Sequence, residues 1–240
     1  MIKPDILSWG LGRDSTAVLV GWHMRGFRPD AIVLADVGSE KPETYAYLDV
    51  IRPWLKKVGF PDVTIVRYVP PIAPYDTIEG NCTMNCTLPS ECFGRGACTI
   101  KWKIGPQNKW AKNNPDFKHI FESDDLKIIK YIGYEAEEGG RKTKMEKGKA
   151  ALLEKERLAQ KNAKKHASLS ADKHYEYKYP LIEWGWTLEE CIARIKEEIG
   201  IVPPKSSCWF CLAGETKVVT REGLIPIKDL AGTSPELLIP

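Results

Sequence analysis

Strand-like and helix-like patterns alternate along the first 135 residues, and this alternation limits the chain to few folds. Four short apolar runs indicate buried strands, at residues 6–8, 31–35, 63–66 and 126–129. Helical patterns lie between them, one closed by Gly26 and one running from Pro42 through Trp54. Because strands separated by helices form right-handed βαβ units, we expect an α/β fold with a doubly wound, mostly parallel sheet. Ligands of such sheets bind beyond the carboxyl ends of the strands.

The size and composition of the chain suit an ordinary globular protein. Its 240 residues predict one large domain, or one domain with an appendage, and 43% of them are hydrophobic. No stretch approaches the ~18 apolar residues of a membrane span, and residues 1–5 lack the layout of a signal peptide. We therefore expect a cytoplasmic protein with no membrane partner. The net charge of +3 is too small to imply a nucleic-acid partner by itself.

A glycine-rich loop, SWGLGRDST at residues 8–16, follows the first expected strand and opens the first expected helix. Glycines let the backbone approach an anion closely, and the N–H groups of a helix N-terminus point at it. Ser8, Ser15 and Thr16 add hydroxyl donors, and Arg13 can neutralise phosphate charge. The loop therefore predicts an anion site, with an ordinary capped strand–helix turn as the alternative.

This loop resembles the PP-loop signature of the adenine-nucleotide alpha-hydrolase superfamily, written SGGxDS, whose last four positions match residues 12–15. Its looser spelling is similar to the variant in phage-type phosphoadenosine-phosphosulfate (PAPS) reductase-like proteins. Four later segments resemble that family in the same order: residues 35–44 (its DTG and E-x-PET), 98–106 (Cys-x₄-Lys-x₂-Pro), 132–135 with Arg141, and 179–184 (PL-x-x-W). The resemblance covers about residues 5–211.

The resemblance implies a HUP-type, Rossmann-like fold with a helical C-terminal part, and a site for ATP or a PAPS-like nucleotide with Mg²⁺. Asp36, at the end of the second expected strand, would contact the ribose or hold Mg²⁺, and Arg141 would stabilise developing negative charge. The implied nucleotide-binding residues are Ser8, Gly10, Gly12, Arg13, Asp14, Ser15, Thr16 and Asp36.

The chain carries seven cysteines, and without a secretion signal clustered cysteines indicate metal binding or catalysis rather than disulfides. A CxxC at Cys208 and Cys211 can complete a four-thiolate site with two upstream cysteines. Cys98 is one of these by resemblance to cluster-binding reductases, and Cys92 is our candidate for the other, with Cys82 and Cys86 as alternatives. The site would hold a 4Fe-4S cluster or Zn²⁺, and unligated buried thiols are the alternative. Cys191, inside an expected helix, is interpreted as a core residue.

A basic stretch at residues 141–165 carries many more Lys and Arg than Asp and Glu. It could contact a nucleic acid. Because no aromatic residues interleave with the basic ones, a solvated helix or a flexible lid is the preferred interpretation.

After Phe210 the chain resembles the opening block of an intein. Cys211 is followed by a strand-like run to Thr220, a turn at residues 221–223 and a segment ending in Leu230. The resemblance implies that Cys211 is the splicing nucleophile, which attacks the Phe210 carbonyl to give a thioester. A plain C-terminal hairpin is the alternative.

We therefore expect three parts: a nucleotide-binding α/β domain at residues 1–135, a basic and mainly helical part at 136–210, and an intein fragment at 211–240. The leading hypothesis is a PAPS reductase-like PP-loop enzyme interrupted by a splicing element. It would act at the phosphate or sulfonate of its nucleotide, by adenylation with pyrophosphate release or by sulfonucleotide reduction. The alternatives are a nucleic-acid sulfur transferase on the same fold and a non-catalytic, metal-stabilised binding module.

Overall fold

The computed structural model describes residues 3–72, 74–85, 99–123, 125–136, 173–206, 217–220 and 223–226. The chain divides into two compact units, Met1–Ser206 and Ser207–Pro240. The predicted boundaries at 135/136 and 210/211 stay predictions.

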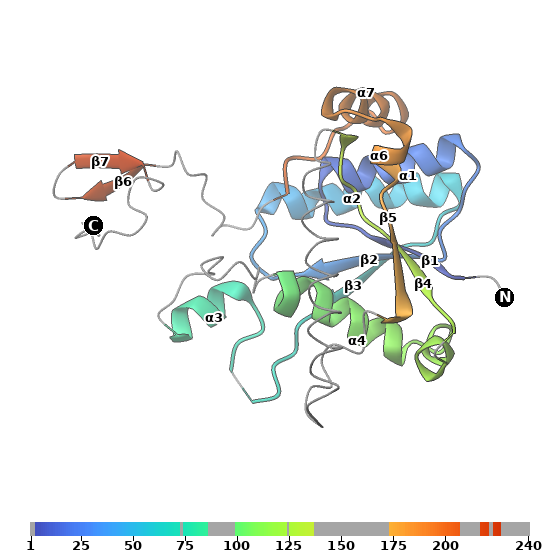
Figure 1. Cartoon of the computed structure of the whole chain (residues 1–240). Coiled ribbons are helices and arrows are strands. Elements are labelled where there is room, and N and C mark those ends of the chain that lie inside the picture. Colours follow the sequence, from blue (N-terminus) through green and yellow to red (C-terminus); the bar gives the residue numbers. More distant parts are fainter. Residues whose placement is uncertain are drawn as a thin grey trace. The chain divides into compact units, whose positions relative to one another are not determined.

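The first unit is built on a five-stranded sheet in which every pair of neighbours is parallel (Figure 1). Its strands are β1 (Asp5–Ser8), β2 (Ala31–Asp36), β3 (Val63–Arg67), β4 (Ile128–Tyr131) and β5 (Tyr175–Lys178). They lie in the order β3-β2-β1-β4-β5. The predicted α/β class with a parallel sheet is confirmed, and the arrangement is Rossmann-like.

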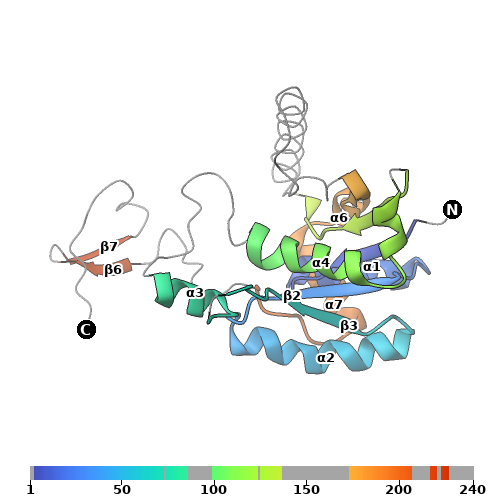
Figure 2. The same cartoon turned by 90° about the horizontal axis from the view of Figure 1, so that it is seen from below.

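Helices cover both faces of this sheet, because successive side chains of a strand point to opposite faces. One core contains Leu7, Ile32 and Leu34 with the helices α1 (Arg13–Met24), α2 (Pro42–Val58), α6 (Pro180–Trp184) and α7 (Leu188–Glu198). The other contains Ile6 and Val33 with α4 (Gly105–Asn113) and the short 3₁₀ helix η2 (Lys118–Glu122). Figures 1 and 2 show α2 and α4 on opposite sides of the sheet.

Two further helical segments lie between β3 and α4. They are α3 (Ile78–Asn85) and a π-helical turn, η1 (Thr99–Ile104), which runs directly into α4. The elements η1 and α4 thus form one continuous helical segment.

Local sequence explains where the longer helices begin and end. Pro42 occupies the first turn of α2, where its missing N–H costs nothing, and Gly59 ends the helix with a left-handed φ of 71°. Thr187 and Glu190 form a capping box at the start of α7, which confirms the helix expected there.

The expected strands at 6–8, 31–35 and 63–66 are confirmed as β1, β2 and β3. The strand expected at 126–129 falls two residues later, at Ile128–Tyr131. Strand β5 was not expected, and it places part of the 136–210 segment in the main sheet.

The described part of the second unit is a hairpin. Strand β6 (Lys217–Thr220) pairs antiparallel with β7 (Gly223–Pro226), in a register that joins Thr220 to Gly223. The predicted hairpin is confirmed, and its assignment to an intein stays a prediction.

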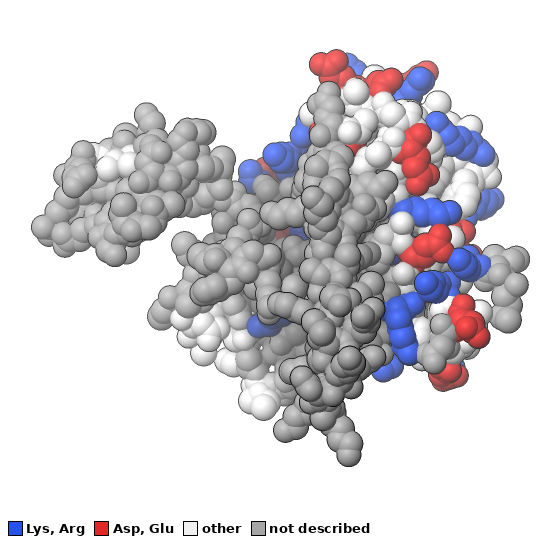
Figure 3. Space-filling view, in the orientation of Figure 1, with Lys and Arg blue, Asp and Glu red and all other residues white. Residues whose placement is uncertain are grey.

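Charged side chains of both signs are interspersed on the described surface seen in Figure 3. Across the ranges that the structure describes, no helix is both long enough and apolar enough to cross a membrane.

Candidate functional site

The loop at residues 8–16 lies at the switch point of the sheet. Strand β1 pairs with β2 on one side and with β4 on the other, so the connections on its two sides diverge. In open parallel sheets this is where a crevice forms beyond the carboxyl ends of the strands. The loop leaves β1 after Ser8 and enters α1 at Arg13. The fold therefore puts the predicted anion-binding loop at the expected ligand edge.

Hydroxyl groups inside the loop fix its shape. The Gly10 N–H donates to Ser15 Oγ at 3.1 Å, and Ser15 Oγ donates to the Gly12 carbonyl at 3.3 Å. Thr16 Oγ1 donates to the same carbonyl at 2.8 Å and accepts from Trp9 Nε1 at 3.1 Å. Ser15 and Thr16 are both buried. In this structure the two hydroxyls stabilise the turn.

The loop exposes backbone and buries its apolar side chains. Trp9 and Leu11 are each 1% exposed, whereas Gly10 is exposed and a Cβ atom there would meet no atom of the described residues within 4 Å. Leu11 has a left-handed φ of 59°, which costs a non-glycine residue about 1–2 kcal/mol. The positive end of the α1 dipole lies at the end of this loop and favours an anion there, although Asp14 places one acidic side chain in the first turn.

Segments distant along the chain pack against the loop, among them those at Gly133 and Ser206. A Cβ atom on Gly133, just after β4, would lie 2.6 Å from the Asp14 carbonyl carbon and 2.6 Å from the Ser15 nitrogen. A Cβ atom on Gly12 would lie 2.7 Å from Ser206 Oγ. Gly133 belongs to the predicted motif at 132–135, so the structure brings that motif to the loop.

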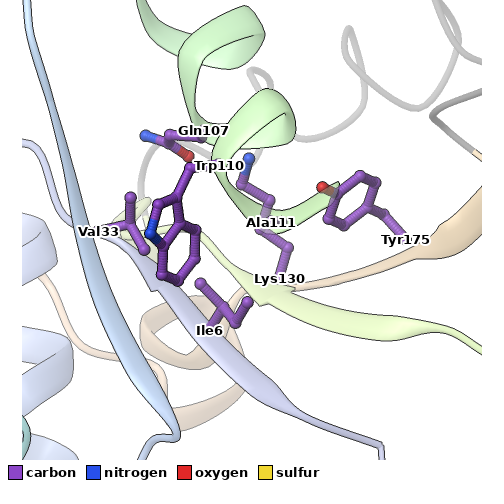
Figure 4. Close-up of a pocket in the computed structure, with 7 residues that line it drawn as sticks. All are labelled: Ile6, Val33, Gln107, Trp110, Ala111, Lys130 and Tyr175. Atoms are coloured by element: carbon purple, nitrogen blue, oxygen red, sulfur yellow. The ribbon is translucent and has the colours of Figure 1, made fainter. Parts of the chain in front are cut away.

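Helix α4 is tied to the first residue of the loop. Ser8 Oγ donates to Gln107 Oε1 at 2.9 Å, and Gln107 is 6% exposed. Beneath Gln107 lies a cavity of about 10 Å³, drawn in Figure 4, whose walls are mostly apolar. It holds one water at most, so this cavity cannot accommodate a nucleotide.

Asp36, at the carboxyl end of β2, is held by the protein itself. Its Oδ1 accepts from the Gly38 N–H at 2.8 Å and the Tyr45 hydroxyl at 2.5 Å, and its Oδ2 accepts from Arg67 Nε at 2.8 Å. Burial alone would raise the pKa of Asp36, but the hydrogen bonds from Tyr45, Gly38 and Arg67, with the Arg67 charge, hold it below its usual range. Direct contact of Asp36 with ribose or Mg²⁺ stays a prediction.

Lys103 and Glu40 form a second charged pair near this edge. Lys103 Nζ lies 3.6 Å from Glu40 Oε1, and the Glu40 side chain is 6% exposed. The neighbouring Lys101 donates to Asn81 Oδ1 at 3.1 Å and lies among the rings of Tyr68, Tyr75 and Trp102.

The sequence analysis assigned no role to Glu40, Arg67, Gln107 or Ser206. Glu40 lies within the segment that resembles E-x-PET, and Ser206 directly precedes the CxxC region. Both therefore lie in or beside motifs that the sequence shows. Arg67 and Gln107 carried no sequence signal, because their partners Asp36 and Ser8 are far away along the chain.

Several predicted residues lie outside the described residues: Arg141, the basic stretch 141–165, Cys86, Cys92, Cys98, Cys208 and Cys211. Cys191 is fully buried in α7, which confirms its place in the core, and burial raises the pKa of its thiol to about 12. Among the described residues, no group of three or more His, Cys, Asp or Glu side chains is arranged to hold a metal ion.

No family model, curated protein or solved structure matches this chain. The fold and the site define an α/β protein of Rossmann-like arrangement whose glycine-containing loop opens at the switch point of its sheet.

Proposed function

We propose that the chain is a PAPS reductase-like PP-loop enzyme that binds ATP or a sulfonucleotide at residues 8–16. The observation that carries the proposal is the exposed Gly10, two residues before the N-cap of α1 and at the switch point. The next residue, Leu11, is buried with a left-handed φ, at a cost in conformational energy. Such strain is typical of functional loops.

In the proposed reaction the loop binds the phosphates and Arg13 offsets part of their charge. Arg141 stabilises the negative charge that develops at the transferring phosphate or sulfonate. Mg²⁺, when bound with the nucleotide, neutralises phosphate oxygens. The chemistry is either adenylation of an acceptor with release of pyrophosphate or reduction of a sulfonucleotide, and a 4Fe-4S cluster or Zn²⁺ held by Cys92, Cys98, Cys208 and Cys211 would accompany it. If an intein begins at Cys211, splicing would remove this ligand, and a Cys at the start of the downstream extein would restore the CxxC.

The experiment is a titration of the full chain with Mg-ATP, followed by calorimetry and by melting temperature. At 100 times its dissociation constant, a ligand of the native state stabilises it by ~2.7 kcal/mol, which raises the melting temperature of a chain this size by about 5–10 °C. The informative variant is Gly10→Val, because open space around Gly10 lets the side chain fit while it blocks the approach of an anion. We expect Gly10→Val to melt like the wild type without ATP and to lose the ATP-dependent rise. A wild-type melting temperature that is unchanged both at millimolar Mg-ATP and at a millimolar sulfonucleotide would reject the proposal.

We further propose that Cys211 begins an intein, and the β6–β7 hairpin supports this. The Cys211 thiol would attack the Phe210 carbonyl carbon, the C–N bond would break, and the freed amino group would take the proton as a thioester forms. The coding sequence downstream of Pro240 tests this directly. A His-Asn end followed by Cys-Pro is expected, and a stop codon there would reject the intein.

A further inference from the structure

The carboxylate of Glu40 is buried, and its Oε2 has no hydrogen-bond partner among the described residues. Its Oε1 faces Lys103 Nζ at 3.6 Å, beyond a normal hydrogen bond. Buried charged groups in native proteins are nearly always paired and hydrogen-bonded, because an unsatisfied one loses its hydration without compensation. Among the residues that the structure describes, Oε2 is therefore an acceptor without a donor.

Glu40 and the loop at residues 8–16 follow the carboxyl ends of two neighbouring strands, β2 and β1. Lys103, the partner of Glu40, is four residues before Gln107 in the continuous segment η1–α4, and Gln107 accepts from Ser8 at the start of the loop. The continuous segment η1–α4 thus contacts both Glu40 and the first residue of the loop.

Acidic side chains after the second strand of a doubly wound nucleotide site accept hydrogen bonds from the ribose. Asp36 is the first acidic residue there, but all of its bonding described above goes to Gly38, Tyr45 and Arg67. In the segment between β2 and α2, Glu40 has a carboxylate oxygen, Oε2, that accepts no hydrogen bond from the described residues.

We propose that Glu40 Oε2 accepts a hydrogen bond from a ribose hydroxyl, so that the site takes an adenosine nucleotide with a free 2′,3′-diol and disfavours one with a 3′-phosphate. The inference rests on the proposed nucleotide-binding function. A 3′-phosphate would bring a second anion against a buried carboxylate. Two cations beside these carboxylates are already paired, Lys103 with Glu40 and Arg67 with Asp36.

The test compares two ligands that differ only in the 3′-phosphate, AMP and adenosine 3′,5′-bisphosphate, by calorimetry on the full chain. We expect AMP to bind about 10- to 100-fold more tightly, the range of a hydrogen bond to a charged group. The 2′- and 3′-deoxy forms of AMP identify which hydroxyl contributes, and one of them binds about 10-fold more weakly than AMP.

Two variants assign the effect to Glu40. Glu40→Gln removes the charge and reduces the preference for AMP over the bisphosphate to below about threefold. Glu43→Gln removes an exposed carboxylate of the same helix start and leaves the preference intact. If Glu40→Gln does not fold, the comparison of AMP with the bisphosphate on the wild-type chain tests the preference by itself.

The possible results distinguish failure of the role of Glu40 from failure of the proposed nucleotide binding. Tight binding of AMP with equal or tighter binding of the bisphosphate overturns the role of Glu40 and leaves the nucleotide site standing. Equal loss of both ligands in Glu40→Gln also overturns it, because a merely structural carboxylate would act on both. Absence of all nucleotide binding rejects the proposed function, and the inference with it.

Discussion

Ser206 lies directly against Gly12 of the loop, with its Oγ 2.7 Å from where a Cβ atom on Gly12 would be. The chain reaches this place from the end of α7, and the Tyr47 hydroxyl anchors it on the way by donating to the Ile201 carbonyl at 3.0 Å. Gly12 is thus required for a close approach between the loop and the segment that precedes the CxxC. The contact ties the predicted nucleotide site to the C-terminal part of the first unit.

We expect Gly12→Ala to destabilise the protein by about 1 kcal/mol, because the added methyl group would overlap Ser206 Oγ and force that side chain to another rotamer. Urea unfolding measures the change. The double variant Gly12→Ala with Ser206→Gly removes the overlapping atoms and should restore most of the loss. If the double variant is no more stable than Gly12→Ala alone, the Ser206 contact is not the cause.

Gly133→Ala should behave differently, because its Cβ atom would meet backbone atoms of Asp14 and Ser15 rather than a side chain. No small substitution can relieve that overlap, so we expect a loss of at least about 1–3 kcal/mol together with weaker ATP binding. Gly10→Ala, which enters open space, is the matched control and should leave stability unchanged. Wild-type stability and ATP affinity in Gly133→Ala would show that β4 and the loop are not in contact.

The carboxylate of Asp36 should make the folding stability of the protein fall at acidic pH. Its folded pKa lies below the unfolded value of ~3.9, so its contribution is complete above that value and is lost as the pH falls through the folded pKa. Asp36→Asn should cost about 1–3 kcal/mol at pH 7, the range of hydrogen bonds to a charged group. The loss should shrink below pH 4.

Unfolding measured from pH 7 down to pH 2 tests this. Glu197→Gln, which removes an exposed partner of Arg194, is the control and should change stability by less than about 1 kcal/mol. A loss in Asp36→Asn that stays constant down to pH 2 would contradict the role given to its charge.

Cys191 should resist alkylation in the folded protein. Its thiol is fully buried and its pKa is raised to about 12, so almost no thiolate is present at pH 8. We expect iodoacetamide to leave Cys191 unmodified at pH 8 and to label it in urea, as read by mass spectrometry of its peptide. Rapid labelling of Cys191 without denaturant would contradict its place in the core.

Most of the sheet was predictable from local sequence, because β1, β2 and β3 are continuous apolar runs closed by turn residues. Strand β5 was not, since its sequence YEYK alternates aromatic and charged residues at the edge of the sheet. The two-residue error in β4 has a tertiary cause, because pairing with β1 places Ile129 beside Asp5 and sets where the strand begins.

The location of the candidate site could be predicted from the sequence, but the contacts of its individual residues could be predicted only in part. The loop at residues 8–16 and the motif at Gly133 come together as expected of a switch point. The partners of Asp36 could not be foreseen, because Arg67 becomes its neighbour only through the pairing of β2 with β3. The position of Glu40 depends likewise on Lys103, which comes from a helical segment that the sequence analysis did not predict.

The most direct test of the central claim is a crystal structure of the full chain with a non-hydrolysable ATP analogue. Our account predicts phosphate oxygens against the backbone at Gly10 and the first turn of α1, with the ribose beside Glu40. An analogue bound away from residues 8–16, or a loop left empty at saturating concentration, would contradict it.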